Sequence, residues 1–234
     1  MWVPLLVAAV TPGISLLTYF YLKDRYDAEP IRNVLRLFII GLLLVFPTMF
    51  IQRGAVLWLG DSPFTFSFLI SGGIEEFLKW FIIYFTIFNQ TIFNEPYDGV
   101  VYTVAVSLGF ATLENVLYAF AQPADPLSLL IRALLPVSGH ALFAVIMGFY
   151  FGKAKFSGEL QRKMLLYSLA LPILAHGLFD YIQMAFNASW TWTIIPFIAM
   201  LWICAMILVR KALDISPFRY VFQDEMVKPS TNGQ

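Results

Sequence analysis

Two features are scarce in this sequence: charge and cysteine. Charged side chains make up 13% of its 234 residues, against about 25% in an average soluble domain. Fifteen Lys and Arg balance fifteen Asp and Glu, so the chain has no basic excess with which to bind a nucleic acid. The single cysteine, Cys204, excludes a disulfide within the chain. The composition therefore excludes a disordered chain, a nucleic-acid-binding protein and an ordinary soluble enzyme.

Several catalytic motifs are also missing. The sequence contains no His-Glu-x-x-His, which excludes a standard zincin. It contains no Gly-x-Ser-x-Gly, and its one cysteine lies in a stretch without charges. A serine or cysteine protease is therefore poorly supported.

Apolar residues are abundant: they form 59% of the chain, and the mean hydropathy is +0.74. They predict an all-α, polytopic membrane helix bundle of about seven transmembrane helices, because a span needs roughly 20 apolar residues. We assign residues 1–212 to one integral-membrane domain and 213–234 to a cytoplasmic tail. The expected spans are 2–22, 34–52, 64–88, 99–121, 129–152, 164–186 and 191–209.

The cations predict the orientation of the bundle. With seven spans, twelve Lys and Arg fall on one side and only Arg53 and Arg132 on the other. Because cytoplasmic loops are enriched in Lys and Arg, the N-terminus is expected outside the cell and the C-terminus in the cytoplasm. Loop 23–33 is then a cytoplasmic, solvated loop. The twelve are Lys23, Arg25, Arg32, Arg36, Lys153, Lys155, Arg162, Lys163, Arg210, Lys211, Arg219 and Lys228.

Ionisable residues inside the expected spans point to a site. Each costs roughly 2.5–3.5 kcal/mol near the bilayer centre, so such residues usually face a protein interior and serve a function. At ~1.5 Å per residue, four of them, on four different spans, lie about 10–17 Å below the outer surface. This shared depth predicts one polar site. The four are Glu75, Glu114, His140 and His176; Glu76, Lys79 and Asp180 are the other ionisable residues of these spans.

Local spacing supports a shared pocket. Glu75 and Lys79 are four residues apart on one helix face, as are His176 and Asp180. The first pair can neutralise itself, and Asp180 can orient the imidazole of His176. Carboxylates and histidines at one depth can activate water and stabilise an oxyanion. They are equally acceptable zinc ligands, so metal-free and metal-assisted chemistry both remain open.

At these residues the sequence resembles a known superfamily. Glu75-Glu76-Phe-Leu-Lys79 resembles the Glu-Glu-x-x-Lys/Arg signature of intramembrane proteases that include the CAAX-type prenyl-protein proteases, the bacteriocin-immunity-type proteases and the PrsW family. The similarity is greatest to the PrsW family. It extends over most of the chain, through Tyr-Phe-Tyr-Leu-Lys-Asp at 19–24, Leu-Val-Phe-Pro at 44–47, Tyr-Asp-Gly at 97–99, Ser-Leu-Gly-Phe-Ala-Thr-Leu-Glu-Asn at 107–115, Met-Gly-Phe-Tyr at 147–150 and His176-Gly-x-x-Asp180.

The resemblance implies a peptidase of the bacterial cell membrane that acts in regulated intramembrane proteolysis. Such an enzyme makes the first (site-1) cut, near the extracytoplasmic face, in a single-pass transmembrane anti-sigma factor. A site-2 intramembrane protease then acts on the product and releases a sigma factor during envelope or antimicrobial-peptide stress. The expected partners are thus this substrate and membrane lipid, and no nucleic acid.

The resemblance and the depth argument together give the site residues. We expect Glu75, Glu76, His140 and His176 to be catalytic, supported by three further residues. No cofactor is certain; if a divalent metal such as zinc is present, Glu76, His140 and His176 are its expected ligands. Two alternatives stay open: a non-proteolytic scaffold or adaptor of the same fold, and a proton-coupled transporter. The supporting residues are Lys79, Glu114 and Asp180.

Overall fold

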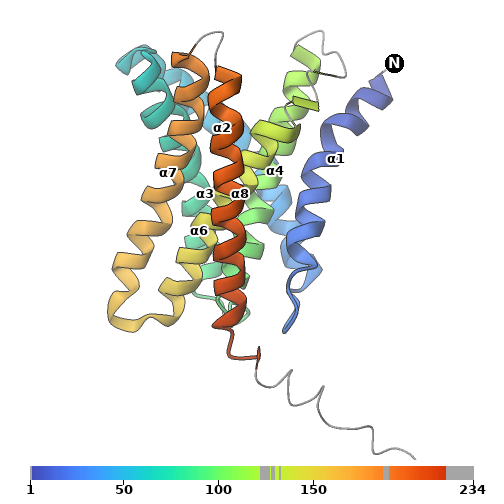
Figure 1. The fold of residues 1–234 in the computed structure, drawn as a ribbon, viewed down its shortest axis with the longest axis vertical. Helices are drawn as coiled ribbons and strands as arrows, with labels where there is room; N and C mark the ends of the chain where they lie inside the picture. Colours follow the sequence, from blue (N-terminus) through green and yellow to red (C-terminus); the bar gives the residue numbers. More distant parts are fainter. Residues whose placement is uncertain (1, 122–126, 128–129, 132, 187–189, 220–234) are drawn as a thin grey trace, which may run out of the picture.

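The computed structural model of the chain describes residues 2–121, 127, 130–131, 133–186 and 190–219, and every regular element within them is a helix. The bundle in Figure 1 confirms the predicted all-α membrane fold. Its long helices are α1 (Trp2–Tyr21), α2 (Ile31–Leu59), α4 (Asp98–Ala121), α6 (Ser138–Phe156), α7 (Gln161–Ala185) and α8 (Trp190–Asp214). Helices are expected in lipid because each satisfies its own backbone hydrogen bonds.

The third expected span is helical but irregular. Six helices of the described chain are long and apolar enough to cross a membrane, and the stretch 64–88 is not among them. Here the chain passes through a π-helix, η1 (Thr65–Ser71), the short α-helix α3 (Gly72–Ile83) and a second π-helix, η2 (Tyr84–Phe88). A third π-helix, η3 (Ala133–Val137), leads into α6, and a 3₁₀ turn, η4 (Gly158–Leu160), joins α6 to α7. The described chain is thus helical in each of the seven expected spans, and six of its helices have the length and composition to cross a membrane.

The second span is longer than expected. It was predicted at 34–52, but α2 continues to Leu59 and ends at Gly60. Gly60 has a φ of 76°, a left-handed conformation that glycine adopts without steric cost. The extension places Gln52 well inside the helix.

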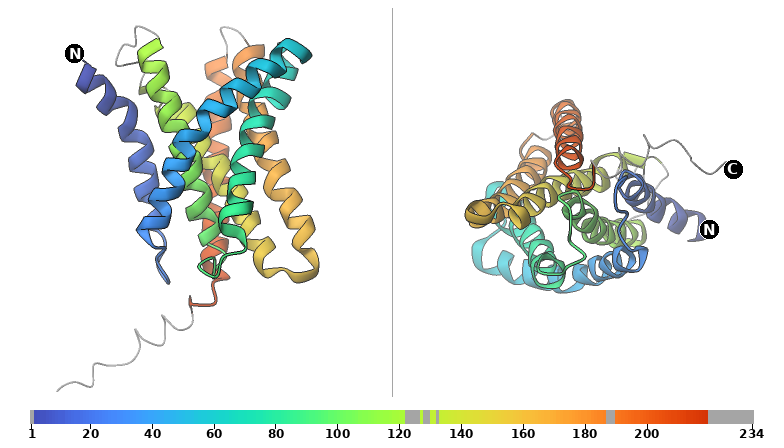
Figure 2. Two further views of the ribbon diagram at one scale, coloured as in Figure 1. Left: turned by 180° about the vertical axis from the view of Figure 1, so that it is seen from behind. Right: turned by 90° about the horizontal axis from the view of Figure 1, so that it is seen from below.

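Helix α4 forms the centre of the bundle. Every residue from 98 to 112 is buried, and α4 packs against α1, α2 and α6 (Figure 2). The crossing with α2 is very close: a Cβ added at Gly109 would lie 2.0 Å from the carbonyl oxygen of Phe38. Small residues allow this approach, which drives helix association in lipid.

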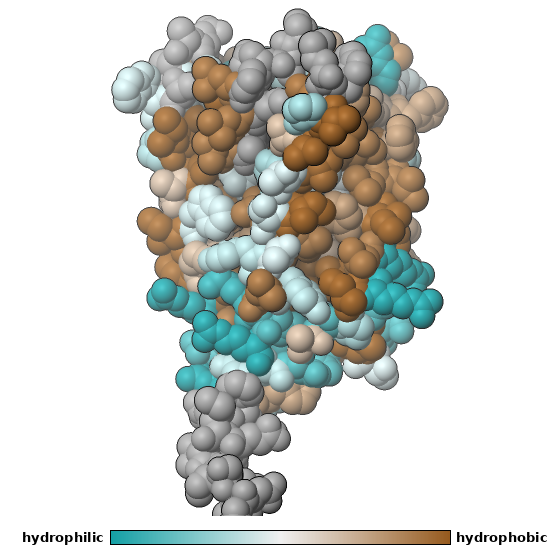
Figure 3. Space-filling model, turned by 90° about the vertical axis from the view of Figure 1, so that its right-hand side faces the viewer, coloured by the Kyte–Doolittle hydropathy of each residue, from teal (hydrophilic) through white to brown (hydrophobic). Residues whose placement is uncertain are grey.

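The two ends of the bundle differ. On the face in Figure 3, hydrophobic residues cover much of the height, and hydrophilic residues gather at the lower end, where α8 finishes. The loop between α1 and α2, the turn between α6 and α7 and the end of α8 all lie at this end (Figure 1). The prediction of a solvated loop 23–33 is wrong for two acids, since Asp24 is 7% exposed and Glu29 3%.

Candidate active site

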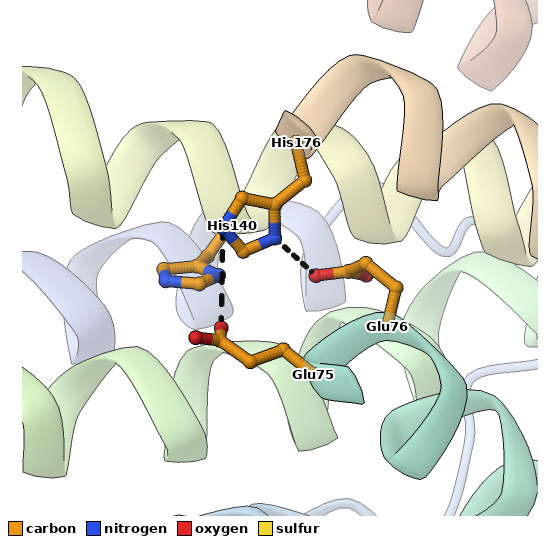
Figure 4. Close-up of side chains that lie close together, drawn as sticks. All are labelled: Glu75, Glu76, His140 and His176. Carbon is orange, nitrogen blue, oxygen red and sulfur yellow. Dashed lines mark hydrogen bonds and ion pairs between the residues drawn. The ribbon is translucent and has the colours of Figure 1, made fainter. Parts of the chain in front are cut away.

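Three helices bring together the four residues predicted to be catalytic. Glu75 and Glu76 lie in the first half of α3, His140 near the start of α6 and His176 in α7. Both α3 and α6 begin directly after a π-helix, and π-helical turns occur often at functional sites. Figure 4 shows the four side chains pointing toward one another. One potential ligand atom from each residue lies within 4.8 Å of the others, and all four residues are buried.

Among these four residues, Glu76 and His176 make the shortest contact. The two atoms His176 Nδ1 and Glu76 Oε1 are 2.9 Å apart. His176 Nε2 lies 3.6 Å from Asp180 Oδ2 and 4.0 Å from Glu75 Oε2 (Figure 4 shows the contacts with the two glutamates). Asp180 therefore lies beside the imidazole, as its spacing indicated, but Glu76 is the nearer partner. The ring of Phe143 stacks on His176 with 4.9 Å between centroids, which fixes the plane of the imidazole.

Lys79 supplies a positive charge inside the cluster. Its Nζ is 2.8 Å from Glu76 Oε1 and 3.5 Å from Glu75 Oε2, and the side chain is 1% exposed. The spacing predicted a pair with Glu75, and the structure adds the closer pair with Glu76. Nζ also lies 4.4 Å from the ring centre of Phe110, in cation–π range. Two buried carboxylates thus share one ammonium group, which reduces the cost of burying them.

His140 connects Lys79 to Glu114. Its Nδ1 is 3.1 Å from Lys79 Nζ, and its Nε2 is 3.0 Å from Glu114 Oε2. An ammonium group only donates hydrogen bonds, so Nδ1 accepts and Nε2–H donates to Glu114. Glu114, the fourth residue of the predicted layer, therefore does lie at the site.

The cluster borders a cavity of about 350 Å³. Glu75 lines this cavity, whereas Glu76 and Lys79 are packed behind it. Glu75 Oε1 accepts hydrogen bonds from Gln52 Nε2 (3.0 Å) and Ser71 Oγ (3.5 Å). Its Oε2 has no hydrogen-bond partner. The other ionisable residues on the wall are Glu114, His140, His176 and Asp180.

Gln52 is a site residue that the sequence analysis missed. It stood at the last position of an expected span, where a polar side chain is ordinary. Because α2 continues to Leu59, Gln52 lies within the helix and its amide reaches Glu75. The sequence did hold one signal for Gln52. If the span is allowed to continue to Leu59, Gln52 becomes a polar side chain inside it.

The donor set fits a zinc-type metal ion. Zinc accepts carboxylate oxygens and imidazole nitrogens, and the cluster offers two of each. Glu75 Oε2 and Glu76 Oε2 are both buried without a hydrogen-bond partner. Unsatisfied buried oxygens of this kind are rare and are typical of a position where an ion or water binds.

Comparison with known proteins identifies the family. The model of the "PrsW family intramembrane metalloprotease" family matches residues 29–209. Protease PrsW of Geobacillus kaustophilus is 50% identical over 209 residues, covering 89% of this chain and 92% of the relative. Protease PrsW of Bacillus subtilis is 49% identical (89% of this chain, 95% of the relative), and that of Clostridioides difficile 32% (86% and 88%). No solved structure matches.

These matches cover most of both chains, and the matched region contains all the residues of the cluster. The family is described as a metalloprotease, which agrees with the donor set found here. The chain belongs to the PrsW family of intramembrane metalloproteases, multi-pass enzymes of the bacterial cell membrane that hydrolyse peptide bonds.

Proposed function

We propose that this protease makes the site-1 cut, near the extracytoplasmic face, in a single-pass transmembrane anti-sigma factor. A site-2 intramembrane protease then acts on the product, which leads to sigma-factor release under envelope or antimicrobial-peptide stress. The observation that carries the peptidase chemistry is the convergence of Glu75, Glu76, His140 and His176 at one cavity. The choice of substrate rests on the family resemblance and on the depth of the site.

The position of the cluster supports a cut near the outer surface. The basic segments after α1, α6 and α8 lie at one end of the bundle (Figures 1 and 2), which is the expected cytoplasmic end. His140 is near the opposite end of α6, about 24 Å along the helix from Phe156 at ~1.5 Å per residue. His176 is about 14 Å from the end of α7 at Ala185, on the same rise. With the N-terminus outside the cell, as the distribution of Lys and Arg predicts, the site lies nearer the outer surface.

Within this proposal Glu75 is the general base. Of the two glutamates, only Glu75 lines the cavity, and its Oε2 is free of hydrogen bonds. A carboxylate in this position can accept a proton from a water molecule bound in the cavity. Gln52 and Ser71 hold the other oxygen and so fix the direction in which Oε2 points.

Glu76 has a different role, because it is fully buried between Lys79 and His176. We assign it to holding both of these side chains in place. His176 faces the cavity and can stabilise the oxyanion or protonate the leaving amine, and His140 stands beside it, with 5.1 Å between the ring centroids. Lys79, Glu114 and Asp180 complete the cluster as supporting residues.

A zinc-type ion would be held by Glu76, His140 and His176, and it would supply Lewis-acid polarisation of the scissile carbonyl and of the attacking water. In that state Glu75 keeps the role of proton acceptor, since it lines the cavity and its Oε2 has no hydrogen-bond partner.

The test is cleavage of a purified single-pass anti-sigma factor by the purified protein in liposomes. We expect Glu75→Gln to lower the rate by 10²–10⁴-fold, the usual contribution of a general base. Glu76→Gln should also abolish cleavage, because His176 and Lys79 lose their partner. Glu159→Gln, at an exposed acid outside the site, is the matched control and should cleave normally. A chelator should stop the wild-type reaction, and added zinc should restore it.

Two results would count against the proposal. Cleavage that persists in both active-site variants would remove the glutamates from the mechanism. A variant inactive in liposomes that still supports loss of the anti-sigma factor in cells would favour the scaffold or adaptor alternative.

A further inference from the structure

A second cluster of acids lies far from the active site. Asp24 comes from the loop after α1, Glu95 from the loop before α4 and Asp98 from the first residue of α4. One oxygen of each lies within 4.8 Å of the others, and their side chains are 7%, 0% and 0% exposed. Asp98 and Glu114 are about 24 Å apart along α4 at ~1.5 Å per residue, so the two clusters are separate.

Each of the three carboxylates is held by one of its oxygens. Asp24 Oδ2 accepts the N–H of Glu29 at 3.2 Å, and Asp98 Oδ2 accepts the N–H groups of Asn94 and Glu95 at 2.7 and 2.9 Å. Glu95 Oε2 accepts a hydrogen bond from the hydroxyl of Ser216, just beyond α8. The carboxylates are therefore fixed in position by the backbone and by a neighbouring hydroxyl.

No N–H or hydroxyl donor reaches the second oxygen of each carboxylate, and the neighbours of these groups are other carboxyl groups, Glu95 beside Asp24 and Glu29 beside Asp98. Asp24 Oδ1, Glu95 Oε1 and Asp98 Oδ1 are buried and have no hydrogen-bond partner. Within the described ranges, no Lys, Arg or His nitrogen lies within 4.0 Å of these residues, in contrast to the active-site glutamates and Lys79. Buried carboxylates without a counter-charge or hydrogen-bond donors are costly, so these oxygens require a cation or a proton.

A fourth buried acid also lacks a positive charge beside it. Glu29, 3% exposed, accepts a hydrogen bond from the hydroxyl of Tyr102 and has no cationic partner among the described residues. Four buried carboxyl groups thus gather at this end of the bundle without a lysine, arginine or histidine nitrogen of the described chain within 4.0 Å.

We propose that Asp24, Glu95 and Asp98 bind a hard divalent cation, calcium or magnesium, in a structural site distinct from the active-site metal. The donors are carboxylate oxygens, with no imidazole or thiolate, which is the chemistry of calcium and magnesium sites and not of zinc. Ligands on opposite sides of a calcium ion lie about 4.6–5.2 Å apart, from its usual ~2.3–2.6 Å distances, so the spacing of these oxygens is suitable.

The site would connect three parts of the chain. Asp24 lies in the loop between α1 and α2, and Asp98 is the first residue of the central helix α4. Glu95 accepts a hydrogen bond from Ser216, just beyond the end of α8. These segments meet at the end of the bundle where α1 and α8 finish (Figure 1). A cation there would hold α1 and α8 to α4, with no part in the reaction at the other end.

The experiment measures ion binding by the purified full-length protein after treatment with a chelator. Equilibrium dialysis with calcium alone and with magnesium alone should show about one bound equivalent in a site of this kind. Glu76→Gln removes an active-site donor and should leave this binding unchanged. Asp214→Asn is the matched control, because Asp214 is an acid at the same end whose side chain is 62% exposed.

Two variants test the site itself. Glu95→Gln removes a ligand, and we expect the bound equivalent to be lost together with the rise in melting temperature that the cation gives the wild type. Ser216→Ala leaves all carboxylates in place and removes only the hydroxyl that holds Glu95. Loss of such a supporting group typically weakens metal affinity about 10–100-fold. The Ser216→Ala variant therefore keeps the test decisive even if Glu95→Gln does not fold.

Either of two outcomes would overturn the proposal. One is a wild-type protein that binds neither ion and melts at the same temperature with chelator as with cation; the carboxyl groups would then share protons. The other is binding that is equally strong in wild type, Glu95→Gln and Ser216→Ala, since the ion would then lie elsewhere.

Discussion

The hydrogen bond from Gln52 to Glu75 gives a sharp test of how the active site is built. Gln52 Nε2 lies 3.0 Å from Glu75 Oε1, the other oxygen of Glu75 has no hydrogen-bond partner, and Glu75 lines the cavity. Gln52→Leu keeps the size and helical preference of the side chain but removes the donor. Gln52 is a positioning residue in this account, since it acts on the reaction only through Glu75.

The expected magnitude follows from the chemistry of this bond. A hydrogen bond to a charged group contributes roughly 1.5–3 kcal/mol, whereas hydrogen bonds between membrane helices average about 0.6 kcal/mol. Glu75 also keeps Ser71 Oγ at 3.5 Å and Lys79 Nζ at 3.5 Å, so its orientation is only partly lost. We therefore expect a loss of about 1–2 kcal/mol of transition-state stabilisation, which is about a 5- to 30-fold lower rate.

The assay is the initial rate of cleavage of a single-pass substrate in liposomes, measured over a range of substrate concentrations. The reduction should fall on kcat with little change in KM, because Gln52 orients the base and does not bind substrate in this account. Gln183→Leu is the matched control: Gln183 lines the same cavity, but its Nε2 donates to the carbonyl of Phe179 and not to the cluster. The reasoning is refuted if Gln52→Leu cleaves at the wild-type rate, or if both variants lose activity equally.

Three further results are expected. Gly109→Ala should destabilise the fold by about 1–3 kcal/mol or more, because its Cβ would lie 2.0 Å from Phe38 O, whereas Gly54→Ala, with open space around it, should not; thermal melts of the two variants compare them. In the presence of a chelator, Lys79→Met should lower the free energy of unfolding by roughly 3–5 kcal/mol, because it leaves two buried carboxylates without their ammonium group. A wild-type melting temperature under the same conditions would contradict the ion-pair account. Dialysis against a chelator should abolish cleavage, and zinc should restore it; unchanged cleavage by metal-free protein, verified by elemental analysis, would exclude a catalytic metal.

The sequence carried enough information to predict the fold class and the ionisable residues of the site, although not Gln52. Long apolar stretches require helices in lipid, and charge inside them is costly, so Glu75, Glu114, His140 and His176 could be singled out. Counting residues from the span ends then placed them at one depth. The structure brings these four together at one cavity, and their part in the reaction stays a prediction.

The local geometry could not be predicted from spacing. Helical spacing finds neighbours within a helix, such as His176 and Asp180, but the shorter contact of His176 is with Glu76 on another helix. The π-helices before α3 and α6 also change the direction of the side chains that follow. Whether a π-helix forms depends on how the helices pack, and an average helical period of 3.6 residues does not describe its wider turns.

The adjacent glutamates show how much depends on packing. Side chains at neighbouring helix positions point about 100° apart, so both glutamates can face one pocket only at its wide edge. The spacing does not say which of the two lies at the cavity. The structure answers this: Gln52 and Ser71 turn Glu75 to the cavity wall, while Lys79 and His176 enclose Glu76.

The two acidic clusters illustrate why local charge patterns reveal one kind of site and hide another. Lys79 is three and four residues from its glutamates, so a charge pair inside a span could be recognised in the sequence. Asp24 is more than 70 residues from Glu95, and both stand in loops where acids are ordinary. Only the fold buries them together. Since no lysine or arginine nitrogen of the described chain lies within 4.0 Å of them, the charge directly beside these oxygens is supplied by protons or by the proposed cation.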